Sequence, residues 1–274
     1  MSWNWRAMRA IMRKDLKQVL QNKMVWLPMI IVPVIFLIIF PGIVVVMPTL
    51  VSPKDLELDD LGRLFRQLPP QFKTMLQGSS AQQQFTILGA NFLFAPMFLI
   101  IPLMVSSILG ADSFAGEKER KTLEGLLYTP VSDTELFIAK VLTALIPAMV
   151  VNVASFVLYG LVVNLGGYHA VGRIFFPAVT WWPLVFWVGP ALAVAGLGAT
   201  VLTSSKAKTF MEAQQTSGML VLPVVFLMIG QVTGLFFLGV GLEMIVGLLI
   251  WAVGLWLVWV GSKTFSRGEL IARI

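Results

Sequence analysis

The densest group of charged side chains lies in one stretch between two long apolar segments. Residues 111–140 read A-D-S-F-A-G-E-K-E-R-K-T-L-E-G-L-L-Y-T-P-V-S-D-T-E-L-F-I-A-K. On a helix, Glu117 is spaced to pair with Lys121 at i,i+4 and with Arg120 at i,i+3. The pattern predicts a short, charged helix over 113–129 that can dock on a partner and transmit a push. It also fits a solvated, salt-bridged loop helix with no docking role.

The ends of this helix carry their own signals. Thr129-Pro130 stops it, because a residue before proline is disfavoured in helical conformation. Ser132-x-x-Glu135 is a capping box that begins the next helix. We therefore expect the charged helix to be an ordered element held between two membrane helices.

The sequence lacks the motifs of several common enzyme and nucleotide-binding sites. The sequence contains no G-x-x-x-x-G-K-[S/T], no H-E-x-x-H and no G-x-S-x-G, which argues against a phosphate-cradling loop, a zinc protease site and a nucleophile elbow. There is no cysteine and only one histidine, His169, which we interpret as a surface residue. We expect no catalytic, metal-binding or cofactor-binding residue, and no enzyme activity of the chain by itself.

The composition is that of a membrane protein. Hydrophobic residues make up 57% and charged residues 12% of the 274 residues, whereas soluble domains carry about 25% charged residues. A spanning helix needs about 20 mostly apolar residues, and six segments qualify. They are 24–47, 89–111, 136–163, 177–203, 215–238 and 241–261. The sequence predicts an all-α polytopic fold, in which the region 230–241 is either a tight hairpin or a short re-entrant piece.

The distribution of basic residues predicts the orientation. With these six spans, 15 of the Lys and Arg residues fall on one side and 5 on the other. Because basic loops stay in the cytoplasm, both termini are expected there. Residues 1–22 have apolar and basic sides and are expected to form an amphipathic helix at the membrane surface. Residues 48–88 are expected to form a small extracytoplasmic segment of two short helices broken by Pro69-Pro70.

Polar residues within the spans are neutral. Asn91, Asn152 and Gln231 are the candidates for a substrate pathway, although such side chains commonly bond helices to one another instead. One alternative function is ion-coupled secondary transport. Such a transporter buries ionisable residues near the bilayer midplane, whereas the ionisable residues of the predicted spans lie near span ends. Another alternative is a non-transporting membrane subunit that relays force.

Three sequence segments resemble the permeases of type-2 ABC exporters, which have the type V transporter fold. They are S-F-A-G-E-K-E-R-K-T-L-E-G-L-L-Y-T-P-V-S at 113–132, K-T-F-M-E-A-Q-Q leading into L-V-L-P at 208–223, and F-S-R-G-E-L-I-A-R at 265–273. The A-Q-Q sequence is similar to the sodium- or drug-exporting branch. The resemblance implies one transmembrane domain over 1–274 that forms the substrate pathway of an ATP-driven exporter.

The resemblance also implies partners and contact residues. Segment 113–129 would be the coupling helix that docks on a separate ABC ATPase, and the helix at 1–22 would touch the same subunit. The implied coupling residues are Phe114, Gly116, Glu117, Lys118, Glu119, Arg120, Thr122, Leu123 and Glu124. ATP and Mg²⁺ would bind to the ATPase, and a second permease, identical or related, would complete the transporter. A prokaryotic inner or plasma membrane is the expected location, with the bilayer but no nucleic acid as a further partner. The substrate, whether ion, drug, lipid or peptide, stays open.

Overall fold

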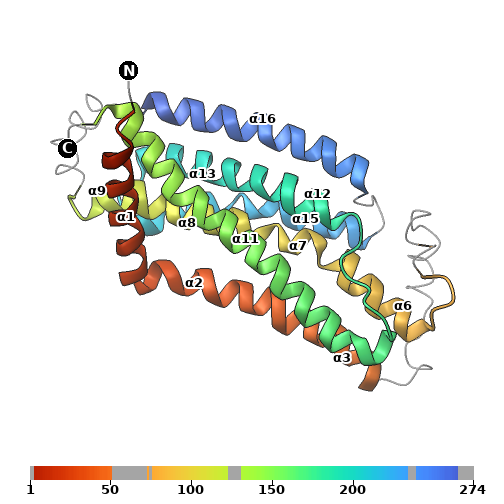
Figure 1. Cartoon of the computed structure of the whole chain (residues 1–274). Coiled ribbons are helices and arrows are strands. Elements are labelled where there is room, and N and C mark those ends of the chain that lie inside the picture. The colour runs from red at the N-terminus through yellow and green to blue at the C-terminus, as the bar shows by residue number, and fades with distance from the viewer. Residues whose placement is uncertain (1–2, 51–72, 74–75, 123–130, 234–238, 265–274) are drawn as a thin grey trace.

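The computed structural model of the chain describes residues 3–50, 73, 76–122, 131–233 and 239–264 (Figure 1). All regular structure in these ranges is helical. The predicted extracytoplasmic helices around Pro69-Pro70 lie largely outside the described residues, as do Leu123 and Glu124. Residues 234–238 are also outside, so the choice between hairpin and re-entrant piece stays open.

Six helices are long and apolar enough to cross a membrane, as the sequence predicts. Spans one to six are Lys23–Val46, Gln82–Glu119, Asp133–Val171, Trp181–Lys206, Phe210–Gln231 and Val240–Thr264. Spans two and four are the most buried and form the centre of the bundle, whereas spans one, five and six lie at its edge. The all-α polytopic fold is therefore confirmed.

The spans are built from the following elements. Span one contains α2 (Lys23–Val34), η1 (Ile35–Ile39) and the first part of α3 (Phe40–Leu50), which continues beyond the span. Span two contains α6 (Ala81–Leu88), η2 (Gly89–Leu93), α7 (Ala95–Phe98), α8 (Ile100–Ala111), η3 (Asp112–Gly116) and α9 (Glu117–Glu119). Span three is α11 (Asp133–Val171), and span four contains α12 (Trp181–Pro183), η4 (Leu184–Val188) and α13 (Gly189–Lys206). Span five contains α14 (Phe210–Gly218) and α15 (Val221–Val232), and span six is α16 (Val240–Thr264).

Span two is longer than the sequence predicts. Its 38 residues continue through 113–119, the first part of the expected separate helix. At 1.5 Å per residue the span is about 57 Å long, while the hydrocarbon core of a bilayer is about 30 Å thick. The charged end of span two can therefore project from the hydrocarbon as a direct continuation of the helix that begins at Ile100.

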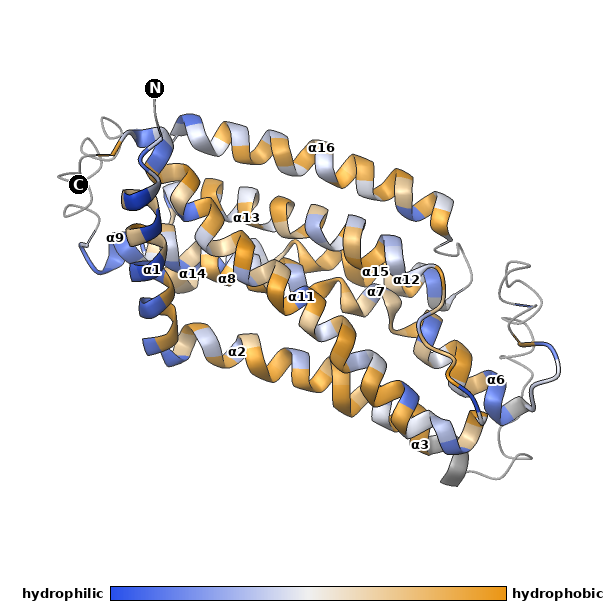
Figure 2. Ribbon diagram, in the orientation of Figure 1, coloured by the Kyte–Doolittle hydropathy of each residue, from blue (hydrophilic) through white to orange (hydrophobic). Residues whose placement is uncertain are grey.

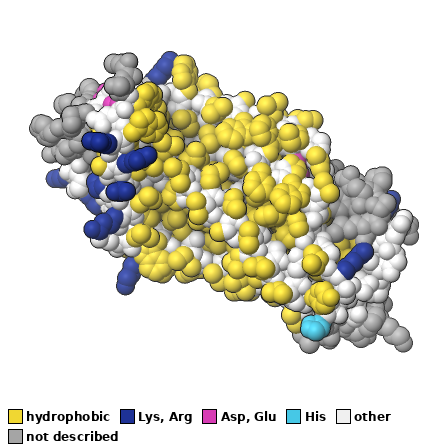
Figure 3. Space-filling view, in the orientation of Figure 1, with side chains coloured by type: hydrophobic (Ala, Val, Ile, Leu, Met, Phe, Trp, Pro, Cys, Tyr) yellow, Lys and Arg dark blue, Asp and Glu magenta, His cyan; other side chains and the backbone are white. Residues whose placement is uncertain are grey.

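The two ends of the bundle differ in polarity. The helix α1 (Trp5–Gln21) crosses the bundle at one end, where it packs against α11, and α9 and the end of α16 lie at the same end of the bundle (Figure 1). We call this the proximal end, and we call the end with α3, α6 and the close of α11 the distal end. Hydrophilic residues gather on α1 and α9, while hydrophobic ones run along the spans (Figure 2). Lys and Arg cluster at the proximal end of the face shown in Figure 3, and apolar side chains cover its middle.

The η segments are wide turns that leave backbone carbonyls without their usual helical partner. In η2 these carbonyls accept hydrogen bonds from side chains of three other spans. The bonds are Tyr159 Oη to Ala90 O (2.6 Å), Trp181 Nε1 to Asn91 O (2.9 Å) and Gln231 Nε2 to Phe92 O (2.7 Å). Since an unpaired carbonyl costs free energy in an apolar core, the wide turn fixes spans three, four and five around span two.

Candidate functional site

Glu117 is the centre of a buried ion network at the proximal end. It is the first residue of α9, and its side chain is 0% exposed. Its carboxylate pairs with Lys14 on α1 and with Lys140 on α11. The expected pairs with Arg120 and Lys121 are wrong for Glu117, because α9 packs this side chain inward against two other helices instead of leaving it on a solvated face.

Lys140 joins span three to the end of span two. It is also 0% exposed and bonds the Glu117 carboxylate. Its Nζ donates to Ser113 O at 2.6 Å, a carbonyl of the wide turn η3, and lies 3.8 Å from Asp15 Oδ2. A lysine has three donors, so one side chain can hold both the carboxylate and the turn. Without these partners a buried ammonium would be very costly.

Asp15 places a second carboxylate in the network. It lies on α1, is buried, and its Oδ1 is 2.9 Å from Lys14 Nζ. Burial raises the pKa of Asp15, an effect that the charge of Lys140 partly offsets. Burial alone would lower the pKa of Lys14, but its hydrogen bond to Glu117 and the charge of that carboxylate outweigh burial and raise it.

Asp15 could have been found from the sequence. The structure buries Met8, Ile11 and Val19 of α1 against the bundle, and Asp15 falls on the same side at helical spacing. An acidic residue on an apolar face of an otherwise basic helix indicates a buried partner. Apolar character alone does not mark the buried side of α1, because Leu20 on the same helix is 73% exposed.

A further ion pair lies beside Glu117. Arg120 Nη1 is 2.8 Å from Asp112 Oδ1, and Nη2 donates to Asp112 O at 3.2 Å. Gln18 on α1 donates to Asp112 Oδ2 at 3.3 Å. Gly116 leaves room for this pair, because a Cβ there would lie 2.9 Å from Asp112 Oδ1. We define the ion network as Lys14, Asp15, Asp112, Glu117, Arg120 and Lys140, in which three acids face three bases.

The exposed end of span two is also attached to the junction of spans four and five. Glu119 Oε2 accepts from Phe210 N at 2.8 Å, at the first residue of α14. Lys118 Nζ donates to Ala207 O at 3.3 Å, just after α13. A carboxylate at a helix N-terminus satisfies a free backbone donor and complements the helix dipole. The end of span two therefore contacts α1 and spans three, four and five.

The predicted capping box at Ser132 is confirmed and has an additional partner. Glu135 N donates to Ser132 Oγ at 3.2 Å, and Ser132 N donates to Glu135 Oε2 at 2.8 Å. The other oxygen of Glu135 accepts from Asn4 N at 2.8 Å, at the N-cap of α1. One carboxylate thus fixes the start of span three and the start of α1 together.

The predicted coupling residues divide into two groups. Phe114 and Gly116 are buried in η3 with Glu117, so they support the network from within. Residues 119–122 are exposed and form the surface of the proximal tip, and Lys118 is half-buried beside them. We define the tip as residues 118–122; only this part of the described coupling segment can meet a partner directly.

The predicted pathway residues bond to backbone atoms inside the bundle. Asn91 donates to Ile87 O (3.1 Å) and to Phe175 O (3.2 Å), and its Oδ1 accepts from Ala178 N (2.8 Å). Asn152 Nδ2 donates to Val185 O (2.9 Å) in η4, and Gln231 donates to Phe92 O as described above. These contacts favour the alternative in which the three side chains hold helices together.

A polar-edged groove lies instead between spans two and five. Its volume is about 260 Å³. Among its lining residues are Met104 and Ser107 of α8 and Met211, Gln214 and Gln215 of α14. We call it the proximal groove. Its lining offers hydroxyl and amide groups beside apolar ones and no charged side chain, a combination that suits a neutral or amphipathic ligand.

Among the described residues, no group of three or more Asp, Glu or His side chains is placed to hold a metal ion.

Comparison with known proteins identifies the family. No curated protein and no solved structure matches the chain. The model of the ABC-2 family transporter protein matches residues 9–253, which include the ion network, spans one to five and the first part of the sixth span. The chain therefore belongs to the ABC-2 family of transporter proteins and is an ABC transporter membrane permease.

Proposed function

We propose that this permease belongs to an ATP-driven exporter whose ATPase is a separate polypeptide, and that the ATPase docks on the tip at 118–122. The ion network carries this proposal, because it connects an exposed, charged tip with α1 and span three through buried contacts. The family match supports the permease and implies an ATPase partner. ATP and Mg²⁺ would bind to that partner, and the chain alone would hydrolyse no ATP.

The contacts describe how a push at the tip would spread. Arg120 is bound to Asp112, and Glu117 to Lys140, so movement of the tip carries span three. The bond from Phe210 N to Glu119 carries the start of span five. Buried pairs resist separation, since breaking one leaves an uncompensated charge. The proximal ends of these spans would therefore move together.

The charges support a cytoplasmic proximal end. Arg6, Arg9, Arg13 and Lys17 are exposed on α1, and the end of α16 lies at the same end of the bundle (Figure 1). By the positive-inside rule, both chain termini would be cytoplasmic. The type V fold, the sodium- or drug-exporting branch and a prokaryotic inner or plasma membrane remain parts of this proposal, based on the sequence resemblance.

The proximal groove is our candidate for the start of the substrate pathway. It opens beside the exposed polar side of α14, where Gln215 and Thr216 are turned outward within a membrane span. Polar groups are costly against lipid, so a second permease, identical or related, would cover this side. Substitution of Met211 by Trp should change the substrate dependence of ATP hydrolysis. Met219→Trp is the matched control, because Met219 is equally an exposed methionine of span five but does not line the groove.

A second candidate function is ion-coupled transport, and Glu243 favours it. This carboxyl is buried at the distal end of span six, and its Oε2 has no hydrogen-bond partner. Ionisable groups of this kind commonly mark ion or proton pathways. If an ion gradient alone drove transport by the purified chain in proteoliposomes, this second function would replace the first.

The docking proposal is tested by reversing one exposed charge. Lys121→Glu should leave expression and thermal stability unchanged, because Lys121 is exposed, but it should weaken copurification of a subunit that mass spectrometry identifies by its phosphate-binding loop. Arg173→Glu, an exposed reversal at the distal end, should retain the ATPase. Equal retention by both variants would contradict docking at the tip.

A further inference from the structure

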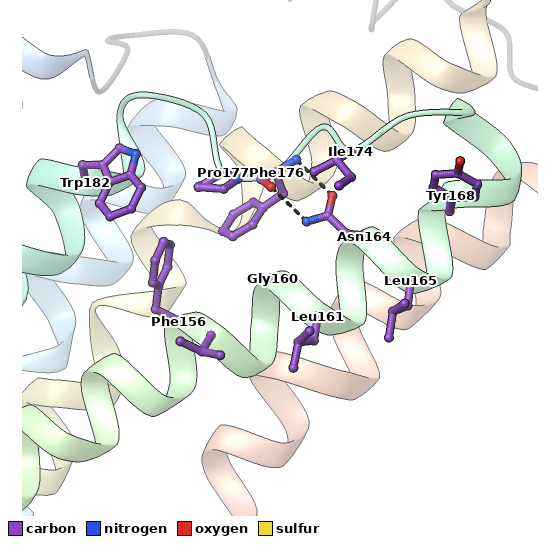
Figure 4. A pocket seen from close by; sticks show the side chains of 11 residues that line it. Phe156, Gly160, Leu161, Asn164, Leu165, Tyr168, Ile174, Phe176, Pro177 and Trp182 are labelled. Atoms are coloured by element: carbon purple, nitrogen blue, oxygen red, sulfur yellow. Dashed lines mark hydrogen bonds between the residues drawn. The ribbon is translucent and has the colours of Figure 1, made fainter.

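A second groove lies at the distal end, on the side of span three. It has a volume of about 550 Å³ and runs between α11 and the segment 172–180 that leads to α12 (Figure 4). Among its lining residues are Val157, Leu161, Asn164 and Leu165 of α11 and Ile174 and Phe176 of the segment that follows. We call it the distal groove. It shares no residue with the proximal groove or with the ion network.

The groove is a consequence of how segment 172–180 is fixed to α11. Asn164 accepts from Phe175 N (3.1 Å) and Phe176 N (3.2 Å) and donates to Phe176 O (2.9 Å). Phe156 packs against Phe176 at the floor, and Gly160 contributes no side chain between them (Figure 4). A Cβ at Gly160 would lie 3.2 Å from the Phe176 ring, so the floor is closely packed while the space above it stays open.

The groove opens to the surroundings of a membrane span. Its walls contain exposed apolar side chains, of which Leu165 is 73% and Ile174 75% exposed. Among the described lining residues, Asn164 alone carries a side-chain amide, and this amide is bonded to backbone atoms of Phe175 and Phe176. In a soluble protein such a patch would mark an interface. Within a membrane span, the medium that meets it is the acyl-chain region of the bilayer.

The rim of the groove at the end of α11 is polar and basic. Tyr168 lines this end, His169 follows it, and Arg173 precedes the lining residue Ile174. All three are exposed. Tyr side chains favour the membrane interface, and a guanidinium suits phosphate oxygens geometrically. The apolar groove and the basic rim are thus arranged like the tail and the phosphate of a lipid.

We propose that the distal groove binds one phospholipid of the adjacent leaflet, with an acyl chain along α11 and its phosphate beside Arg173. A volume of this size is within the range of about 300–1,000 Å³ typical of ligand sites. A second copy of the chain is a poorer occupant, because its contact would remove the exposed polar rim at Tyr168 and His169 from water together with the apolar groove.

The test uses a phosphatidylglycerol that carries a photoreactive diazirine in one acyl chain, at trace level in phosphatidylcholine nanodiscs containing the full chain. After irradiation, mass spectrometry of peptides locates the adducts. We expect adducts on the residues of the distal groove to exceed, several-fold, those on Ile245 and Leu248, which are also exposed in the distal half of span six but line no groove among the described residues. Equal labelling of both sites would mean ordinary lipid contact and would overturn the proposal.

Two variants separate the tail from the headgroup. Val157→Trp should reduce the groove adducts several-fold, because the larger side chain narrows the groove. Leu158→Trp is the control and should not reduce them, because Leu158 is exposed but does not line the groove. Arg173→Gln should lower labelling by photoreactive phosphatidylglycerol more than by the matching phosphatidylcholine. If Val157→Trp left the adducts unchanged, or if a cross-linker attached at an introduced Leu161→Cys joined two copies of the chain, a lipid site would be refuted. No ATPase enters the experiment, so its result is independent of the proposed transport function.

Discussion

Neutralising Glu117 is the most direct perturbation of the ion network. In Glu117→Gln, Lys140 keeps the Ser113 carbonyl at 2.6 Å but retains only Asp15, at 3.8 Å, as a charged partner. Removing one member of a buried ion pair costs about 3–5 kcal/mol. The cost to Lys14 is small, because its side chain is 42% exposed and can turn to water. We therefore expect a loss near the lower limit, about 3 kcal/mol in the free energy of unfolding.

The measurement is a double-mutant cycle by equilibrium unfolding in mixed micelles. Lys140→Met removes the second charge with a side chain of similar length, so Glu117→Gln with Lys140→Met should cost less than the two single losses together, by about 0.5–3 kcal/mol. Glu212→Gln is the control, because Glu212 is exposed and only accepts from Lys208 N at 2.8 Å. If Glu117→Gln destabilised the protein no more than Glu212→Gln does, or if the cycle showed no coupling, the reasoning about the network would be refuted.

Three other predictions follow from single contacts. Burial raises the pKa of Asp15, so the folded protein loses stability as pH rises from the ordinary carboxyl range toward neutrality. Asp15→Asn removes this titration and should therefore gain stability relative to the unsubstituted protein from pH 4 to 7. The measurement is the free energy of unfolding at each pH. Asn91→Leu should lower the unfolding free energy more than Gln231→Leu, because Asn91 makes three hydrogen bonds and Gln231 one, each contributing about 0.5–1.5 kcal/mol. Gly254→Ala should separate spans four and six and lower thermal stability, since a Cβ at Gly254 would lie 2.9 Å from Ala195 N.

The fold could be predicted from the sequence to the extent that hydropathy determines it. Six apolar stretches of sufficient length correspond to six spanning helices, because a backbone in lipid must satisfy its hydrogen bonds within the helix. The Ser132 capping box was also predictable, because its two side chains, Ser132 and Glu135, lie only three residues apart in the sequence. The wide turns were not, since η2 depends on donors such as Tyr159 and Trp181 that come from distant parts of the chain.

The candidate site could be predicted only in part. The charged segment was found, but local spacing assigned Glu117 to Arg120 and Lys121, its neighbours on one helix. The structure assigns it to Lys14 and Lys140, which are 103 and 23 residues away in sequence. Pairing across helices depends on which side of span two faces α1 and α11, and the wide turn η3 changes that side just before Glu117.

The positions of the polar contacts explain how a chain dissolved in lipid can also hold a network of six charges. Inside the bundle, the carbonyls freed by η2 and η4 are bonded by neutral side chains such as Tyr159, Gln231 and Asn152, which carry no charge into the hydrocarbon. The six ionisable groups of the network lie at the proximal end, where a span of about 57 Å exceeds a hydrocarbon core of about 30 Å. There, water and headgroups reduce the cost of ionisation, yet Glu117 and Lys140 are still fully buried by protein. A docking partner at the tip would therefore act on a part of the bundle where buried, charge-paired contacts reach the surface. The neutral contacts farther along the spans would carry the displacement into the membrane.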